Sequence, residues 1–394
     1  MTTPRQAWQR RAYNVEAMRL LARAVLPPPF FDFADGGAEK ECTLRRNEAA
    51  FDEVELLPHP LSGASERDLS VSLFGKELSL PVMIGPAGLA GLFWPDGERC
   101  LARAAGRAGT GFCLSHGSVA PLEDVAACGT SPRWMQIFIY RDRAFTRELA
   151  ERAAKSGYDA LVLTIDNQLL GNRERDIRNG FAIPPRFGVS GLAGMAFKAE
   201  WLWRMRGEIR RITFGNYVRP NETADIKTLA GRMASLLDPS MSWADVDELR
   251  RVWAGPLFLK GILHPHEAKA ALEHGIDGLI VSNHGGRQLD GAPATIDVLP
   301  YIVAAVGGSI PVLIDGGIRR GSDVVKALAL GAKACLIGRP QLWGLTVGGE
   351  AGVVHLLDIY RREIDRVMGL CGVSRIADIG ADLLFTNIQN GPRR

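Results

Sequence analysis

Short runs of apolar, often β-branched residues recur along the chain, and each ends at a glycine or a polar residue. Residues 160–166, for example, read Ala-Leu-Val-Leu-Thr-Ile-Asp. Such nearly continuous hydrophobicity is typical of strands buried on both faces, as in a parallel sheet. The same pattern predicts eight strands, at residues 80–86, 110–115, 133–139, 160–166, 256–261, 278–283, 311–315 and 334–338.

The stretches between these runs have helical character. Residues 265–273 are alanine-rich with helical periodicity, and residues 322–330 begin at a serine of the kind that caps helices. Alternation of strand and helix predicts a parallel α/β fold. Eight units favour a closed (β/α)8 TIM barrel over an open doubly wound sheet, and no G-x-G-x-x-G motif follows the first strand, which disfavours a nicotinamide-binding fold.

Two segments fall outside this rhythm and define the expected organisation. Residues 1–75 predict an N-terminal helical arm packed on a barrel at 76–375, with a C-terminal tail at 376–394. A long insertion at 167–255 follows the fourth strand. Within it, residues 191–218 interleave tryptophans with basic residues, which indicates either a lid or subunit contact over the barrel mouth or an amphipathic surface helix on an anionic membrane.

Composition excludes several classes of protein. A hydrophobic content of 46% supports a buried core, and a net charge of +3 without a long Lys/Arg block disfavours nucleic acid as a partner. The six cysteines and seven histidines are dispersed, so no metal site is expected. The first residues contain no apolar signal core, and no run of about 18 apolar residues occurs. We therefore expect a cytoplasmic protein, at most peripheral on the inner face of the membrane.

Polar residues at the ends of the predicted strands indicate where the chemistry lies, because barrels carry their active sites at that face. His284 and Arg287 end the sixth strand and enclose two glycines that let a ligand approach the backbone. The planar guanidinium of Arg287 suits a carboxylate. Asp166 ends the fourth strand and would stabilise a charged His284. The pattern predicts a proton-abstracting base beside a carboxylate clamp.

Lys260 and two glycine-containing turns extend this site. Lys260 is the only charge in its strand, so a buried ammonium there needs an anionic partner; a reduced flavin ring or a Schiff-base carbonyl would serve. Asp315-Gly316-Gly317 and Gly338-Arg339 close the seventh and eighth strands, where barrels commonly bind phosphate.

The chain resembles the FMN-dependent 2-hydroxy acid dehydrogenase and oxidase family, which includes glycolate oxidase, flavocytochrome lactate dehydrogenase and mandelate dehydrogenase. The motifs SNHGGRQLD, IDGGIRRGSDVVKALALGA, IGRP and GGAEKECTLRRN carry the resemblance, which spans about residues 20–375. The stretches PAGLAGLFWPDGE and RERDIRNGF are most similar to the mandelate dehydrogenase branch.

The resemblance implies FMN as the cofactor and a role for each matching residue. His284 would be the base and Asp166 would stabilise its charged form, while Arg287 and Arg173 would hold the substrate carboxylate and Lys260 would favour the reduced flavin anion. The remaining cofactor contacts would come from Pro86, Ala87, Gly88, Ser115, Gln136, Thr164 and Ser282 around the flavin and ribityl chain, and from Asp315, Gly316, Gly317, Arg319, Gly338 and Arg339 toward the phosphate.

Three positions depart from the family pattern. Phe33 and Phe138 stand where the family usually has active-site tyrosines, which removes two hydrogen bonds of about 1 kcal/mol each. Gly117 stands where oxidases can carry a tryptophan. A roomier, more apolar pocket follows, so the expected substrate is a large or aromatic (S)-2-hydroxy acid resembling mandelate, oxidised to the 2-oxo acid.

Alternatives differ in substrate or in class. The two phenylalanines also fit a tailoring oxidation of a biosynthetic intermediate that lacks a free carboxylate. An inactive flavin-binding scaffold and a flavin-free Schiff-base aldolase using Lys260 are further readings. The electron acceptor would be a quinone, a carrier protein or O2; Gly88, which matches the mandelate branch, favours a dehydrogenase. By resemblance the enzyme would be a homotetramer.

Overall fold

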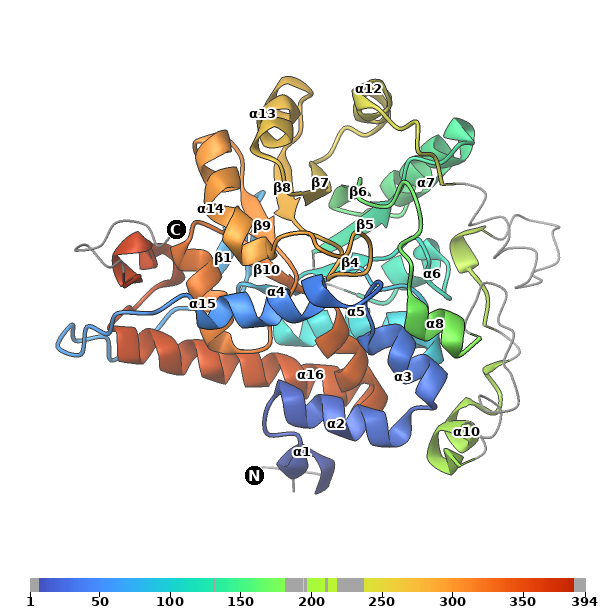
Figure 1. Ribbon diagram of the computed structural model, residues 1–394, viewed down its shortest axis with the longest axis horizontal. Coiled ribbons are helices and arrows are strands. Elements are labelled where there is room, and N and C mark those ends of the chain that lie inside the picture. The colour runs from blue at the N-terminus through green and yellow to red at the C-terminus, as the bar shows by residue number, and fades with distance from the viewer. Residues whose placement is uncertain are drawn as a thin grey trace.

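Eight parallel strands close into a barrel in the computed structural model, which describes residues 7–129, 132–180, 194, 197–209, 212–217 and 237–385 (Figure 1). Each strand pairs in parallel with its neighbours, and the last pairs with the first. The predicted TIM barrel is therefore confirmed. The strands are β3 (Val82–Ile84), β4 (Phe112–Leu114), β5 (Arg133–Ile137), β6 (Ala160–Thr164), β7 (Leu257–Ile262), β8 (Gly278–Val281), β9 (Val312–Ile314) and β10 (Ala334–Ile337).

The strands are buried almost without interruption, which explains why their sequences lack the polar alternation of an exposed sheet. Helices on the outside cover them. Two helices were predicted individually: 265–273 coincides with the observed range, and 322–330 lies one residue later than the helix found. The covering helices are α5 (Gly97–Ala108), α6 (Leu122–Ala126), α7 (Arg143–Lys155), α12 (Trp243–Val252), α13 (Pro265–Glu273), α14 (Thr295–Val306), α15 (Gly321–Ala329) and α16 (Arg339–Cys371).

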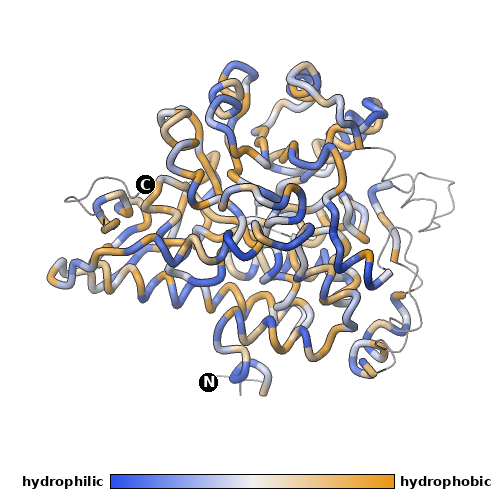
Figure 2. The backbone as a smooth tube through the Cα atoms, in the orientation of Figure 1, coloured by the Kyte–Doolittle hydropathy of each residue, from blue (hydrophilic) through white to orange (hydrophobic). Residues whose placement is uncertain are grey.

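The N-terminal residues form helices that pack on the barrel. Helix α2 lies along α16, and it buries Val15, Met18 and Ala22, a spacing that places them on one face (Figure 1). Figure 2 shows both helices striped with hydrophobic and hydrophilic residues, as expected when one side is buried. The arm comprises α1 (Ala7–Arg11), α2 (Val15–Val25), α3 (Pro28–Asp35) and α4 (Cys42–Asp52), followed by the hairpin β1 (Val71–Leu73) and β2 (Lys76–Leu78).

Helix α4 reaches the carboxyl ends of the strands. Asn47 in α4 and Asn283 after β8 exchange two side-chain hydrogen bonds of 2.8 Å. A β carbon at Gly286 would stand 2.6 Å from the backbone nitrogen of Leu44, so only glycine allows this close approach. The arm therefore forms one side of the barrel mouth. The division at residue 75, which falls between β1 and β2, stays a prediction.

The insertion after β6 contributes short helices near the mouth. They are α8 (Glu174–Arg178), α10 (Ala199–Met205) and the 3-10 helix η3 (Gly215–Tyr217); the other short 3-10 helices are η1 (Ala90–Leu92), η4 (Ile376–Asp378) and η5 (Ala381–Leu383). Residues 191–193, 195–196, 210–211 and 218 of the predicted 191–218 surface segment lie outside the described residues, as does the end of the tail after residue 385. Among the helices that the structure describes, none has the length and apolarity needed to cross a membrane.

Candidate active site

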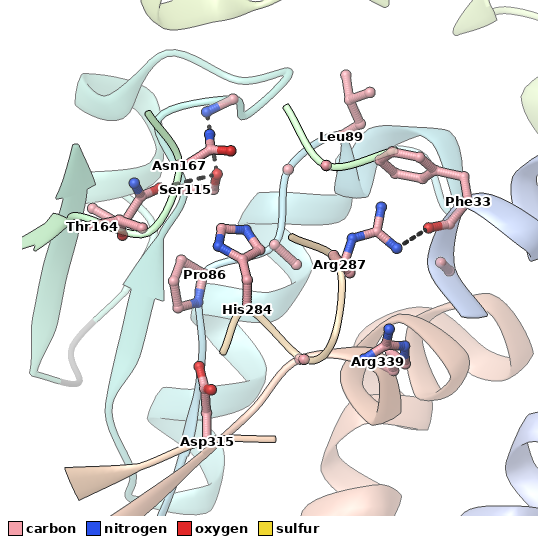
Figure 3. Close-up of a pocket in the computed structure, with 18 of the residues that line it drawn as sticks. Phe33, Pro86, Leu89, Ser115, Thr164, Asn167, His284, Arg287, Asp315 and Arg339 are labelled. Atoms are coloured by element: carbon pink, nitrogen blue, oxygen red, sulfur yellow. Dashed lines mark hydrogen bonds between the residues drawn. The ribbon is translucent and has the colours of Figure 1, made fainter. Parts of the chain in front are cut away.

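A cavity of about 630 Å³ opens at the carboxyl ends of the barrel strands. Figure 3 shows His284 and Arg287 projecting into the same space, with Asp315 and Arg339 lower in the view. The strand ends supply its floor, and the N-terminal arm and the insertion supply its walls. Of the residues predicted from sequence, these line the cavity: Phe33, Pro86, Ala87, Gly88, Ser115, Gly117, Gln136, Phe138, Thr164, Arg173, Lys260, His284, Arg287, Asp315, Gly316, Gly317, Arg319, Gly338 and Arg339.

Asp166 and Ser282, the two other predicted residues, support the lining residues through hydrogen bonds. Asp166 Oδ1 lies 2.9 Å from His284 Nδ1. The Ser282 hydroxyl accepts hydrogen bonds from the backbone N–H of His284 at 3.0 Å and from Lys260 Nζ at 2.8 Å. His284 has a φ of 57°, a left-handed conformation that a residue other than glycine seldom adopts. Such strain is often found at functional sites, and these contacts hold the residue in it.

The charges of the His284–Asp166 pair suit a base. Burial lowers the pKa of His284 below its usual value, and this outweighs the opposing effect of Asp166. Burial raises the pKa of Asp166, but the charge and hydrogen bond of His284 and the charge of Lys260 more than offset it, so that the pKa is lowered overall. At neutral pH the pair is thus a neutral imidazole beside a carboxylate, which is ready to accept a proton and to stabilise it.

Lys260 stays charged although it is buried. Burial lowers the pKa of Lys260, but the nearby charges of Asp315 and Asp166 raise it above the usual value. Its Nζ lies 3.1 Å from Asp315. A cation is therefore fixed at the floor of the cavity, where a Schiff base, which needs a neutral amine, is disfavoured.

Arginines give the cavity a positively charged wall. Arg287 donates hydrogen bonds to the backbone oxygens of Phe33 at 2.7 Å and Gly36 at 2.9 Å. Burial, and then the charges of Arg173 and Arg339, set the pKa of Arg287 well below the usual value. Burial also lowers the pKa of Arg173. Since buried like charges repel one another, this wall is suited to a bound anion.

A second anion-binding region lies at the ends of β9 and β10. Burial and the charge of Arg319 lower the pKa of Arg339 to about 10. Arg339 begins α16, whose first segment runs to a kink at Gly348 and Gly349, and the positive end of that segment's dipole faces the same place. Gly316 and Gly317 have φ values of 90° and 82°, which turn the backbone beside it. The region can hold a phosphate through backbone N–H groups and arginine.

Several lining residues were given no role from the sequence. His116 directly follows Ser115 at the end of β4, and Asp176 lies within the Arg-Glu-Arg-Asp motif that supplied Arg173, so both positions carried a signal. The apolar contributors come from loops and the insertion, where no periodicity marks them. The additional lining residues include Leu89, His116, Asn167, Leu170, Asp176, Ile177, Phe214 and Leu237.

The comparisons with known proteins agree with this geometry. The family model described as FMN-dependent dehydrogenase matches residues 22–386. The chain is 41% identical to human 2-hydroxyacid oxidase 1 over 368 residues, covering 93% of this chain and 94% of that protein. It is 43% identical to L-lactate oxidase from a Nostoc species over 375 residues, covering 94% and 97%.

Solved structures are similar over nearly the whole chain. The crystal structure of the monotopic membrane protein (S)-mandelate dehydrogenase superposes with a TM-score of 0.91 at 38% identity, covering 95% of this chain and 99% of that one. A mandelate oxidase structure with (S)-2-phenylpropionate gives a TM-score of 0.80 at 36% identity, covering 95% and 98%. The barrel and the cavity define a flavin-binding oxidoreductase that acts on CH–OH donors. The chain belongs to the FMN-dependent 2-hydroxy acid oxidase and dehydrogenase family.

The residues present fit FMN. Thr164 Oγ1 and Asp315 Oδ1 are buried in this cavity without a hydrogen-bond partner in the protein, as expected of groups reserved for a ligand with hydroxyl and ring N–H groups. Lys260 supplies a fixed cation, and Arg339 with the start of α16 supplies a phosphate site. FMN contributes the redox chemistry when bound, and the protein contributes binding, orientation and electrostatics.

Proposed function

We propose that this enzyme oxidises (S)-2-hydroxy acids with a large or aromatic side chain, such as (S)-mandelate, to the 2-oxo acid. The observation that carries the proposal is the apolar wall of the cavity. Aromatic or aliphatic side chains line it, while Gly88 and Gly117 leave space between them. This wall comprises Phe33, Leu89, Phe138, Leu170, Ile177, Phe214 and Leu237, and we call it the apolar wall.

His284 is the base in this proposal, and the arginines hold the substrate carboxylate. The neutral ring accepts a proton from the substrate, and Asp166 at 2.9 Å stabilises the resulting imidazolium. Arg287 and Arg173 together provide the positive charge that a carboxylate needs, in a buried setting where charge-assisted hydrogen bonds are strong. Lys260 would supply positive charge to the ring of FMN, and Arg319 and Arg339 would bind its phosphate.

The preferred electron acceptor in this proposal is a quinone or carrier protein rather than O2. The support is Gly88, a glycine that matches the mandelate dehydrogenase branch of the family. The relatives include both oxidases and dehydrogenases, so the rate at which O2 reoxidises the reduced flavin distinguishes the two. After anaerobic reduction, slow reoxidation of the flavin in air is expected, and rapid reoxidation would indicate an oxidase.

Peripheral membrane contact is proposed for the insertion. In α10, Trp201 is buried while Trp203 is 70% exposed, and Phe197 just before the helix is 87% exposed. Exposed aromatics beside basic residues favour a lipid interface. One structural neighbour is described as a monotopic membrane protein. Flotation with anionic liposomes should carry the protein upward, and Trp203→Ser should reduce this. The cytoplasmic location and the homotetramer stay predictions from the sequence.

A substrate screen tests the proposed reaction. The purified yellow protein is mixed anaerobically with (S)-mandelate, lactate or glycolate, and fading of the blue flavin band is followed. Mandelate is expected to reduce the flavin fastest. If no 2-hydroxy acid reduces it, the tailoring reaction on an intermediate without a free carboxylate takes the lead, since the missing hydroxyls of Phe33 and Phe138 favour that alternative.

A further inference from the structure

A second histidine faces the cavity. His116 follows strand β4 and is 9% exposed. Its ring packs edge-on against Phe138, with 4.3 Å between the ring centroids. Phe138 is one of the two positions where a tyrosine hydroxyl is missing. A hydrogen-bonding ring therefore stands beside the side chain that cannot supply such a bond.

One nitrogen of His116 is held by two tyrosines. Nδ1 lies 2.5 Å from the Tyr217 hydroxyl and 2.9 Å from the Tyr140 hydroxyl, and the two hydroxyls are 2.8 Å apart. Burial raises the pKa of both tyrosines, so both carry their protons. Burial, and then the charge of His284, lower the pKa of His116 to about 3, so that its ring is neutral.

The hydrogens of this cluster determine the tautomer of His116. If Nδ1 is bare, Tyr217 donates to Nδ1, Tyr140 donates to Tyr217, and every hydrogen has an acceptor. If Nδ1 carries the hydrogen, one phenol hydrogen is left without an acceptor in a buried cluster, which costs free energy. The first arrangement is favoured, and it places the N–H group on Nε2. Within the described residues Nε2 has no hydrogen-bond partner, and the ring lines the cavity.

The insertion holds this cluster in place. Asn216 Nδ2 donates to the backbone oxygen of His116 at 2.9 Å and to Ser118 Oγ at 3.1 Å, and the N–H of Gly215 donates to the backbone oxygen of Ser118 at 2.9 Å. A β carbon at Gly215 would stand 2.6 Å from the carbonyl oxygen of Val119. Residues 215–217 thus clamp the loop after β4, and Tyr217 is fixed under His116.

We propose that His116 is a substrate-binding residue whose Nε2–H donates to the oxygen on C2 of the 2-hydroxy acid, replacing the hydroxyl that Phe138 lacks. The inference rests on the proposed function and adds a recognition element to it. His116 and His284 both line the cavity, and the charge of His284 acts on the His116 ring. The oxygen on C2, which lies beside the base, is therefore the matching acceptor, and the carboxylate is left to the arginines.

Two ligands that the flavin cannot oxidise distinguish binding of the C2 oxygen from binding of the carboxylate. Benzoylformate carries both groups, and phenylacetate carries only the carboxylate. Binding to the FMN-loaded enzyme is measured from the change in flavin absorbance. In His116→Phe, the Kd for benzoylformate is expected to rise about tenfold, the effect of one lost hydrogen bond, while the Kd for phenylacetate changes less than twofold. His266→Phe, at an exposed histidine, is the matched control and should change neither.

A second experiment restores the hydroxyl that is missing at Phe138. In His116→Phe/Phe138→Tyr, the tyrosine should recover at least half of the lost benzoylformate affinity on a logarithmic scale. The double variant Tyr140→Phe/Tyr217→Phe leaves the His116 ring in place but removes both hydroxyls that contact Nδ1, and a rise of about threefold in the same Kd is expected. If His116→Phe does not retain FMN, Tyr140→Phe/Tyr217→Phe decides whether His116 binds the substrate, with flavin content as the check on folding.

The outcomes separate this inference from the proposed function. An unchanged benzoylformate Kd in His116→Phe and in Tyr140→Phe/Tyr217→Phe, or an equal loss of affinity for both ligands, overturns the role of His116 while leaving the proposed reaction intact. Unmodified enzyme that binds neither ligand overturns the mandelate-like substrate, and the role of His116 falls with it.

Discussion

The two ends of the cavity are built in different ways. The cofactor end consists of strand termini and glycine turns, with Lys260, Asp315 and Arg339 as its charged groups. The substrate end is formed by segments far apart in the sequence: the N-terminal arm with Phe33, the loop after β4 with His116, and the insertion with Phe214.

This difference explains how one barrel serves several substrates. The barrel requires its strand ends to stay in place, so the cofactor end is tied to the fold itself. Loops and insertions change with little cost to the core, so the substrate end can vary independently. The relatives fit this division, because they share FMN dependence while their names refer to lactate, 2-hydroxy acids or mandelate.

The largest effect is expected where the two ends meet, at His284. His284→Ala removes the proposed base, and the rate of anaerobic flavin reduction should fall about 10³-fold, within the range known for general-base catalysis. Stopped-flow absorbance measures this rate, and flavin content confirms that the cofactor end is intact. A fall of less than tenfold would assign proton abstraction to another group.

A substitution at the cofactor end should weaken FMN binding and leave the selectivity between substrates unchanged. Arg339→Ala removes the proposed charge-assisted contact to the FMN phosphate, so the Kd for FMN is expected to rise between about tenfold and 100-fold. Fluorescence titration of apoprotein with FMN measures it. The ratio of mandelate to lactate rates at saturating FMN should stay constant. A changed ratio would show that the two ends are not independent.

The pH dependence of kcat/KM should reflect the protonation of His284. The pKa of His284 is lowered from the usual 6.5, so its ring is neutral at pH 7. The value of kcat/KM should therefore be constant near pH 7. At lower pH, where the ring becomes protonated, kcat/KM should fall about tenfold per pH unit. Asp166 favours the charged ring, so Asp166→Asn should move this acid limb to still lower pH while reducing the rate. An acid limb that moves upward would contradict the assigned pair.

The smallest effect is expected from Phe33→Tyr. The new hydroxyl adds a single hydrogen-bonding group to the apolar wall. It lies near Arg287, whose guanidinium carbon is 5.2 Å from the centroid of the Phe33 ring. A lower KM for lactate, by about threefold, is expected, with little change for mandelate. Steady-state kinetics with both acids checks this. Equal changes for both substrates would indicate that Phe33 does not discriminate by size.

The sequence allowed prediction of the cofactor end more fully than of the substrate end. Continuous hydrophobic runs located all eight strands, and polar residues at their ends located His284, Lys260 and Asp315, because a barrel brings strand ends together whatever the loops do. The positions of Phe214 and Tyr217 depend on how the insertion folds back, which no periodicity encodes. His116 was visible at a strand end, but its tyrosine partners lie 24 and 101 residues away.

A comparison of two substrates tests the central claim most directly. The rate of anaerobic flavin reduction is compared for (S)-mandelate and glycolate with the same FMN-loaded enzyme at subsaturating concentrations. If an FMN-dependent site with an apolar, roomy substrate end is present, mandelate reduces the flavin faster. Faster reduction by glycolate would contradict the assigned pocket, and a protein that takes up no FMN would contradict the account as a whole.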